Sequence, residues 1–280
     1  MSFPRTHASG NLSVPRHCER SVAICTLSLR AQRGNLDAIM NKLYITNENL
    51  LKEAQLLSTF TNQLNICTDL PGDDIFLRLD EDGLAIITKQ FQPLYVHDIY
   101  NKVYLRKDNL SRELLIQAIK IKPAPDILII DATAGFAKDS VLLGLYGYKV
   151  LMLEQNPILA TIVYYAMNNR IIPADNLQLI FTNSLDYFKT NQNIEPYAIY
   201  LDPMFKKQDT ALAKKDMQII QLLTKDETNS DTELFKLAYP LCKKLIVKRD
   251  NKQAVLVPAP LPTYSKQGKT IRYDIYVNNP

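Results

Sequence analysis

The stretch Tyr197-Ala198-Ile199-Tyr200-Leu201-Asp202-Pro203-Met204-Phe205 decides how the rest of this 280-residue chain is interpreted. Its opening run is apolar, aromatic and β-prone, and it stops at an acid followed by a proline. This pattern predicts a buried parallel strand whose carboxyl end is exposed. Ligands of open α/β sheets bind outside that end of the strands. There Asp202, Pro203 and Phe205 would present a carboxylate, a fixed turn and an aromatic face.

Further apolar runs predict a sheet around this strand, at 127–130, 150–153, 177–181 and 245–248. Helices are expected between them, beginning near Lys138, at 157–169, 214–223 and 232–239. The alternating residues 271–276 predict a late antiparallel edge strand. Strands that alternate with helices predict an α/β fold, a doubly wound and Rossmann-like sheet.

The chain before this sheet divides into two parts. Residues 1–39 contain five arginines but no lysine and no tyrosine, and they show no sustained helical or strand period. We interpret them as a disordered extension, or as sequence upstream of a true start at Met40. Residues 40–98 predict a small β-α-β-β module of α+β type, with a helix capped by Asn47 and a hairpin turn at 80–83. The domain that contains the large predicted sheet would then span 99–280.

Composition excludes several classes of protein. The net charge is +4 and the apolar fraction is 46%, as in ordinary globular proteins. No apolar run is long enough to span a membrane. The four cysteines lack metal-like spacing and there are only three histidines, so we expect reduced thiols, a cytoplasmic protein and no metal site.

The turn after the strand 127–130 is the expected cofactor site. Gly135 allows close approach of a ligand, but the other glycines of a dinucleotide fingerprint are missing, which favours a cofactor without phosphates. Glu154 ends the next strand, where it can bind ribose hydroxyls or cap the following helix. Asn183 and Ser184 follow the third strand, and they can bind an adenine edge or form a turn.

Asp202 and Pro203 suit an exocyclic amine of a nucleobase. A carboxylate that accepts one N–H and a backbone carbonyl that accepts the other would free the nitrogen lone pair and aim it. Phe205 would hold the base by stacking. These residue types could orient the amine of guanine or of adenine equally well. In the alternative interpretation the stretch has no catalytic role: Asp202 only ends the strand, and the turn after it packs Phe205 into the core.

The segment between Tyr95 and Lys122 is the most basic part of the chain. It contains Arg106, Lys107 and Arg112, which can contact RNA phosphates or form a solvated charged face. Lys248 and Arg249, after a late strand, are two further candidates for phosphate contacts.

Several motifs together resemble the bacterial ribosomal RNA small subunit methyltransferase J family. They are Asp131-Ala-Thr-Ala-Gly135, Lys138-Asp139, Leu153-Glu154-Gln155-Asn156-Pro157, Ser184-Leu185, Leu201–Phe205, 211–217, 247–249 and 272–276. The likeness runs from about Tyr95 to Tyr276. It implies a class I S-adenosylmethionine-dependent enzyme that methylates N2 of a guanosine in small-subunit (16S) ribosomal RNA, either free or within the small ribosomal subunit.

The resemblance also implies which residues line the cofactor site. Those at matching positions are Lys138, Asp139, Glu154, Gln155, Asn183, Ser184 and Asp202, and we add Asp131 and Gly135 from the first strand end. The family usually has arginine at 138 and 155 and serine at 183, and a glycine-rich stretch at 108–111. An adenine-N6 methyltransferase acting on DNA or RNA, and a ribosome-assembly factor without catalysis, remain the alternative functions.

Overall fold

The computed structural model describes residues 41–203, 215–225 and 230–278, which all lie in one compact unit. Two expectations fall outside these ranges. One is the interpretation of residues 1–39 as an extension, and the other is the stacking role of Phe205.

The first part of the described chain forms a five-stranded sheet in the order β2-β1-β3-β4-β5. The strands are β1 (Asn41–Ile45), β2 (Leu64–Cys67), β3 (Ile75–Asp80), β4 (Gly83–Thr88) and β5 (Leu94–Tyr95), with η1 (Glu48–Leu50) and α1 (Leu51–Thr61) between β1 and β2. The side chain of Asn47 accepts a hydrogen bond from the Asn49 backbone and so caps the start of η1. The β-α-β-β order is observed, and the short strands β2 and β5 are additional.

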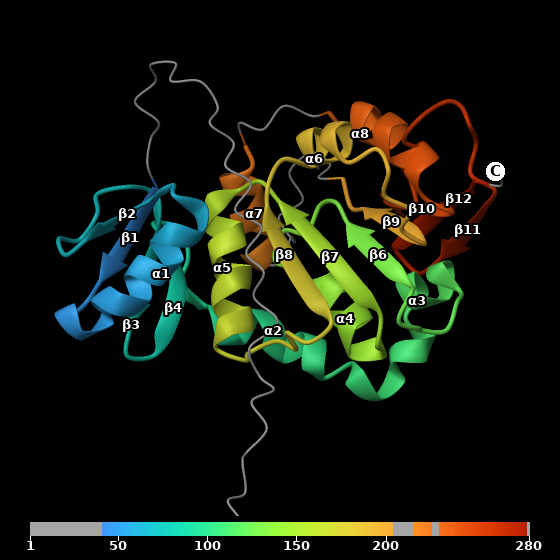
Figure 1. Ribbon diagram of the computed structural model, residues 1–280. Coiled ribbons are helices and arrows are strands. Elements are labelled where there is room, and N and C mark those ends of the chain that lie inside the picture. Colours follow the sequence, from blue (N-terminus) through green and yellow to red (C-terminus); the bar gives the residue numbers. More distant parts are fainter. Residues whose placement is uncertain (1–40, 204–214, 226–229, 279–280) are drawn as a thin grey trace, which may run out of the picture. The chain divides into compact units, whose positions relative to one another are not determined.

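The second sheet has seven strands in the order β11-β12-β10-β9-β6-β7-β8 (Figure 1). They are β6 (Leu128–Asp131), β7 (Lys149–Glu154), β8 (Leu177–Phe181), β9 (Ala198–Leu201), β10 (Lys244–Asp250), β11 (Tyr264–Gln267) and β12 (Ile271–Val277). The five strands from β10 to β8 pair in parallel, and the chain order reverses at β6, which lies between β9 and β7. This reversal is the topological switch of a doubly wound sheet, so the predicted fold is confirmed.

The last two strands differ from the expectation in one respect. β12 pairs antiparallel with β10, as its alternating sequence predicted. However, β11 pairs antiparallel with β12 on its other side, so β12 is not the edge strand. The sequence 264–267 is too short and too polar to show a strand period, and its pairing with β12 forms it.

Helices cover both faces of the large sheet (Figure 1). They are α2 (Val96–Tyr104), η2 (Lys107–Arg112), α3 (Leu114–Ile119), α4 (Lys138–Tyr146), α5 (Pro157–Asn168), α6 (Ser184–Thr190), α7 (Lys215–Leu223), α8 (Asp231–Ala238) and η3 (Tyr239–Leu241). Successive residues of a strand point to opposite faces. Thus Ile129 belongs to the core with α4 and α5, while its neighbour Ile130 belongs to the core with α6 and α8.

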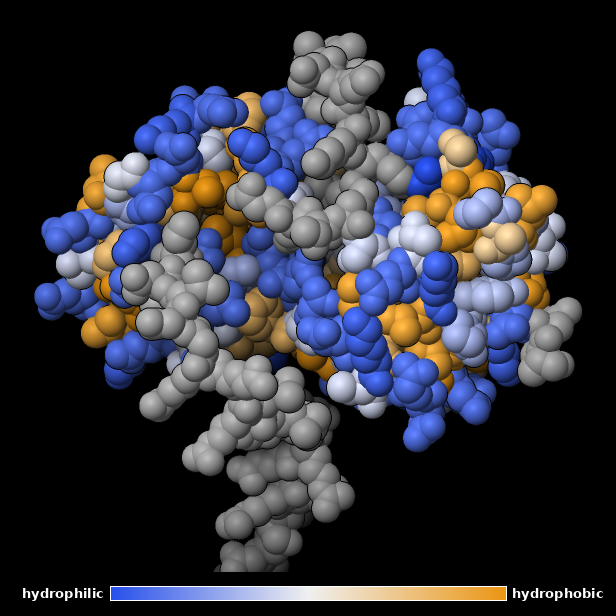
Figure 2. Space-filling view, turned by 90° about the horizontal axis from the view of Figure 1, so that it is seen from above, coloured by the Kyte–Doolittle hydropathy of each residue, from blue (hydrophilic) through white to orange (hydrophobic). Residues whose placement is uncertain are grey.

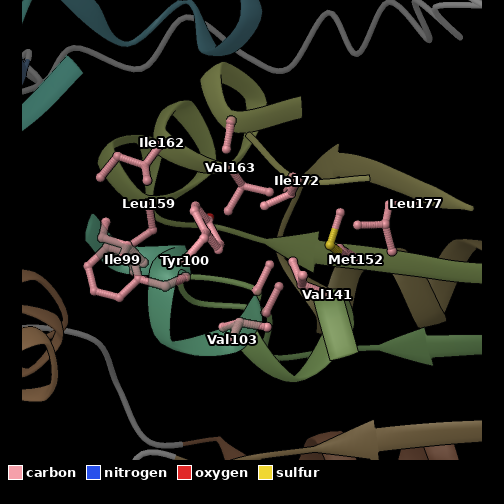
Figure 3. Packing of buried hydrophobic residues seen from close by; sticks show 14 of the residues in the cluster. Ile99, Tyr100, Val103, Val141, Met152, Leu159, Ile162, Val163, Ile172 and Leu177 are labelled. Carbon is pink, nitrogen blue, oxygen red and sulfur yellow. The ribbon is translucent and has the colours of Figure 1, made fainter. Parts of the chain in front are cut away.

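The core on the α4 and α5 face is continuous with the small sheet. Ile99 and Tyr100 of α2 pack beside Leu159 and Ile162 of α5, with Met152 of β7 nearby (Figure 3). Burying side chains of this size stabilises the folded chain by roughly 1.5–3 kcal/mol each. The packing therefore fixes α5, and with it the strand ends on either side of it. The sequence also predicts a helix that Ser111 caps and that runs through Lys120. This helix is observed as α3, but it begins at Leu114, because Ser111 lies within η2.

Seen from above, hydrophilic side chains cover much of the surface and apolar ones appear between them in patches (Figure 2). Among the described residues, no helix combines the length and apolar character needed to cross a membrane.

Candidate active site

Three acids stand at the carboxyl ends of adjacent parallel strands. Asp131 ends β6, Glu154 ends β7, and Asp202 directly follows β9. The pairing of Asp131 with Met152 and with Tyr200 brings the three strand ends side by side. Because side chains alternate along each strand, all three acids lie on the sheet face that carries α4 and α5. The structure thus brings together the strand-end residues that the sequence predicted.

The turn between β6 and α4 is built around Gly135. This residue has a positive φ of 55°, which a side chain would strain. Its backbone N–H donates to Glu154 Oε2 at 2.6 Å. The other carboxylate oxygen of Glu154 accepts from the Asn156 backbone N–H at 2.7 Å, just before α5. Glu154 therefore locks the first turn to the start of the next helix, and it faces the turn where a cofactor was expected.

Asp131 lies beneath this turn and not at its surface. Its side chain is 1% exposed and accepts hydrogen bonds from Ser140 Oγ at 2.6 Å and from the Thr133 backbone at 3.1 Å. Burial, helped by the nearby charges of Asp139 and Asp202, raises the pKa of Asp131 to about 7, although the two hydrogen bonds act to lower it. The geometry gives Asp131 the role of holding the turn.

Asp139 and Asp202 share one partner, Lys248 of β10. The Lys248 ammonium lies 2.9 Å from Asp139 Oδ2 and 2.8 Å from Asp202 Oδ2. Tyr200 donates its hydroxyl to Asp139 Oδ2 at 2.7 Å. The Asp202 backbone N–H in turn donates to Thr133 Oγ1 at 2.7 Å, which ties the end of β9 to the first turn.

The protonation states within this group follow from burial and charge. Burial alone would raise the pKa of Asp139, but Lys248 and the Tyr200 hydroxyl outweigh it and hold that pKa below its ordinary value. Burial would lower the pKa of Lys248, but Asp139 and Asp202 raise it well above its ordinary value. The group therefore holds a charged ammonium beside an ionised Asp139 at neutral pH.

The residues after β8 connect to both neighbouring turns. Asn183 caps α6 by accepting from the Leu185 backbone at 2.8 Å, and its amide donates to Gln155. Ser184 Oγ donates to the Ala132 carbonyl. The turn interpretation of Asn183 and Ser184 is observed, and it places both side chains at the sheet edge expected to bind adenine.

Helix α7 also reaches this edge, which the sequence interpretation missed. Asp216 at its start forms an ion pair with Lys138, and its last residue, Leu223, accepts from the Asn156 side chain at 3.0 Å. A methyl group placed on Gly135 would lie 3.9 Å from Ile220. The sequence did contain a signal that this helix belongs to the site, because Asp216 lies in the motif 211–217, one of those that resemble the family.

The predicted RNA-binding residues separate into two groups. Arg106, Lys107 and Arg112 are exposed, and Arg106 forms an ion pair with Glu113. Lys248 and Arg249 are not surface residues.

We therefore correct the expectation that Lys248 and Arg249 contact phosphate. Lys248 points to the carboxylates of Asp139 and Asp202 on one face of the sheet. Arg249 points to the other face, is 7% exposed, and donates to the Ala254 carbonyl at 3.0 and 2.7 Å. The strand alternation explains this arrangement, because neighbouring residues of β10 cannot point the same way.

A surface hollow of about 270 Å³ lies away from these strand ends. Ser111, Lys120, Lys122 and Tyr146 are among the residues that line it. The residues that line this hollow include no carboxylate. The candidate active site is therefore the carboxyl edge of the sheet, where the three acids lie. Within the described ranges, no three side chains of His, Cys, Asp or Glu form a group that could hold a metal ion.

Comparison with known proteins agrees with this fold and site. Residues 59–278 match the family model described as "Putative SAM-dependent methyltransferase". A protein of Legionella pneumophila strain Corby named "Ribosomal RNA small subunit methyltransferase J" is 33% identical over 237 residues, which cover 82% of this chain and 93% of the relative. A protein of the same name from Thioalkalivibrio sulfidiphilus is 28% identical and also covers 82% of this chain and 95% of the relative.

Among solved structures, a SAM-dependent methyltransferase from Neisseria gonorrhoeae superposes with a TM-score of 0.65. The match covers 85% of this chain and 96% of that one, at 21% sequence identity. This likeness concerns the fold. The family model and the named relatives confirm the resemblance that the sequence motifs indicated.

The residues present fit S-adenosylmethionine, the cofactor of this family. It carries no phosphate, so it does not need the extra glycines of a dinucleotide turn. Among the described residues, a Cβ placed on Gly135 would meet only Ile220 within 4 Å, so this part of the chain leaves room for a ligand at the turn. Glu154 faces the same turn with a carboxylate, the group that binds ribose hydroxyls on this fold. The chain therefore belongs to the SAM-dependent methyltransferase family that its residues 59–278 match, and it is an enzyme that uses S-adenosylmethionine.

Proposed function

We propose that this enzyme methylates the exocyclic N2 amine of a guanosine in small-subunit ribosomal RNA, in the cytoplasm. The relatives named for small-subunit ribosomal RNA methylation support the substrate class, since they cover most of this chain. The choice of guanine N2 rests on the family resemblance of the motif Leu201–Phe205.

The position of Asp202 is the observation that carries this proposal. It follows β9 directly, beside the first turn, and its backbone is held there by Thr133. Its carboxylate lies 2.8 Å from the Lys248 ammonium and is partly exposed, with 34% of the side chain accessible. An anionic acceptor at this edge can take a hydrogen bond from a nucleobase amine that enters from solvent.

Asp202 and Pro203 would act by orienting the amine. The carboxylate accepts one N–H and the Pro203 carbonyl accepts the other, so that the nitrogen lone pair points away from both. S-adenosylmethionine supplies the electrophilic methyl group when bound. Holding two reactants in line contributes on the order of 7–11 kcal/mol to the lowering of a barrier. The stacking role proposed for Phe205 completes this description of the base site.

Arg106, Lys107 and Arg112 are the proposed RNA phosphate contacts. All three are exposed on the segment between α2 and α3. Arg106 lies close enough to Asp139 to influence its pKa, so this basic segment borders the active site. Phosphate contacts there would position the RNA without reading its sequence.

Methyl transfer from tritiated S-adenosylmethionine tests the proposal. The substrates are small ribosomal subunits, the RNA extracted from them, and duplex DNA, each followed by nucleoside analysis. We expect N2-methylguanosine in RNA, and a loss on the order of a hundredfold or more in Asp202→Ala. Asp126→Ala, at an exposed position before β6, is the matched control and should retain activity.

The outcomes separate the alternatives. Label in N6-methyladenosine would favour the adenine methyltransferase and contradict the guanine assignment. Wild-type turnover in Asp202→Ala would contradict the role of the carboxylate. RNA binding without any affinity for S-adenosylmethionine in calorimetry would favour an assembly factor.

A further inference from the structure

Two carboxylates from separate elements converge on one ammonium at the active edge. Asp139 is in the first turn of α4, Asp202 follows β9, and Lys248 is in β10. The ammonium lies within 3 Å of one oxygen of each, at 2.9 and 2.8 Å. The two acids contact Lys248 with only about a fifth to a third of each side chain exposed, so solvent screens these charges weakly.

The surrounding groups make Lys248 the central charge of this cluster. Tyr200 of β9 donates to Asp139, and Tyr273 of β12 lies near Lys248 and both acids. Asp131 of β6 adds a further acid close to Asp139 and Asp202. Arg106, before η2, contributes a second and more distant positive charge to Asp139. Among the described residues, Lys248 is the one lysine or arginine that forms an ion pair with Asp139.

We infer that Lys248 is a positioning residue for the methyl transfer, which keeps the Asp202 carboxylate ionised and aimed at the substrate amine. The inference rests on the proposed function of Asp202. Lys248 of β10 orients the Asp202 carboxylate through its ammonium group. Asp139 holds that ammonium in place, and Tyr200 in turn donates to Asp139.

Removing this charge has a specific physical consequence. Without Lys248, the carboxylates of Asp139 and Asp202 repel each other in a poorly screened environment, and an added proton relieves the repulsion. A protonated Asp202 would donate a hydrogen bond where the amine needs an acceptor. The enzyme should then work only at a pH high enough to ionise both acids again.

The experiment compares wild-type protein with Lys248→Met, Lys248→Gln and Lys248→Arg. Lys189→Met serves as the matched control, because Lys189 forms an exposed ion pair with Glu233 at 3.0 Å away from these acids. Thermal unfolding first establishes that each variant is folded. Methyl transfer to small-subunit RNA is then measured as kcat and KM between pH 5 and 9.

We expect Lys248→Met and Lys248→Gln to lower kcat at pH 7 by at least about tenfold. We expect the acidic limb of their pH profile to move up by about one pH unit or more, as the loss of a close opposite charge implies. Lys248→Arg should keep the wild-type limb and recover most of kcat, and Lys189→Met should match wild type. A lower kcat with an unmoved limb in the neutral variants would overturn the inference.

A second readout does not depend on turnover. Carbon-13 NMR of the aspartate carboxyl carbons, assigned with Asp139→Asn and Asp202→Asn, follows their titration in each protein. In wild type the Asp139 carboxyl should titrate below the ordinary aspartate range, and in the neutral variants it should titrate higher. Ordinary titration of Asp139 in wild type would overturn the inference, even if no neutral variant folds.

The two proposals fail in different ways. Absence of methyl transfer to RNA by wild-type protein would refute the proposed function, while the carboxyl titration would still report on Lys248. Methyl transfer with an unperturbed Asp139 would leave the function standing and refute the role of Lys248.

Discussion

The three strand-end acids have the same chemistry and sequence context but different environments. Asp131 is enclosed beneath the turn, Glu154 joins that turn to α5, and Asp202 is partly exposed beside Lys248. Their places at the sheet edge were predictable, because each follows an apolar run. Their partners were not, since Lys248 comes from β10, 46 residues after Asp202. An ion pair over that separation depends on the order of strands in the sheet.

The buried carboxyl of Asp131 makes stability depend on pH. Its pKa of about 7 in the folded protein lies above the ordinary value of 3.8, so the folded protein binds this proton more tightly than the unfolded chain. The resulting stabilisation is complete below about pH 4 and is lost as the pH rises through 7. Asp131→Asn keeps one acceptor oxygen, for the Thr133 backbone N–H, and turns an amide donor toward Ser140 Oγ, which can accept from it. The substitution removes the titrating group.

We therefore expect Asp131→Asn to gain stability relative to wild type as the pH rises. The difference in the free energy of unfolding should change by on the order of 1–4 kcal/mol between pH 4 and pH 8. Urea unfolding of both proteins at the two pH values measures it. A difference that is the same at both values would show that Asp131 is not the titrating group.

At the scale of elements, the long apolar runs were predicted well and the short elements were not. The bounds of β7, β8 and α5 agree with the expected ranges to within about a residue, because each is a mainly apolar run in the sequence. The short elements β5, β11 and α6 were missed. Their few residues carry too little period, and pairing or capping by distant parts of the chain forms them.

The packing of α1 on α5 connects the small sheet to the sheet that bears the active site. The rings of Phe60 and Tyr164 stack with centroids 4.1 Å apart, and Phe181 at the end of β8 lies 6.4 Å from Phe60. Phe181 pairs with Glu154, so this aromatic group supports the strand end beside the cofactor turn. The small sheet therefore contributes to the stability of the catalytic part of the chain.

We expect Phe60→Ala to lower the free energy of unfolding by about 1–3 kcal/mol, through lost burial and lost stacking. Leu56→Ala on the same helix is the control, because Leu56 is 64% exposed and its truncation should cost less than about 0.5 kcal/mol. Urea unfolding at pH 7 distinguishes them. Equal effects of the two substitutions would contradict a supporting role for the stack.

At the scale of the whole molecule, the alternation of strands and helices in the sequence predicts the fold that the structure shows. The family match supplies the cofactor. The substrate is where physical reasoning from residues stops, because a carboxylate and a prolyl carbonyl orient guanine and adenine amines equally well. The names of the relatives support the proposed ribosomal RNA substrate, and the exposed segment with Arg106, Lys107 and Arg112 is the surface proposed to contact it.

Mass mapping of modified nucleosides in the ribosomal RNA of the source organism tests the central claim most directly. The strains compared carry the intact gene, a deletion, or the deletion complemented with wild-type or Asp202→Ala protein. We predict that one N2-methylguanosine of the small-subunit RNA disappears in the deletion strain, returns with wild-type protein, and stays absent with Asp202→Ala. An unchanged set of modified guanosines in the deletion strain would contradict the account.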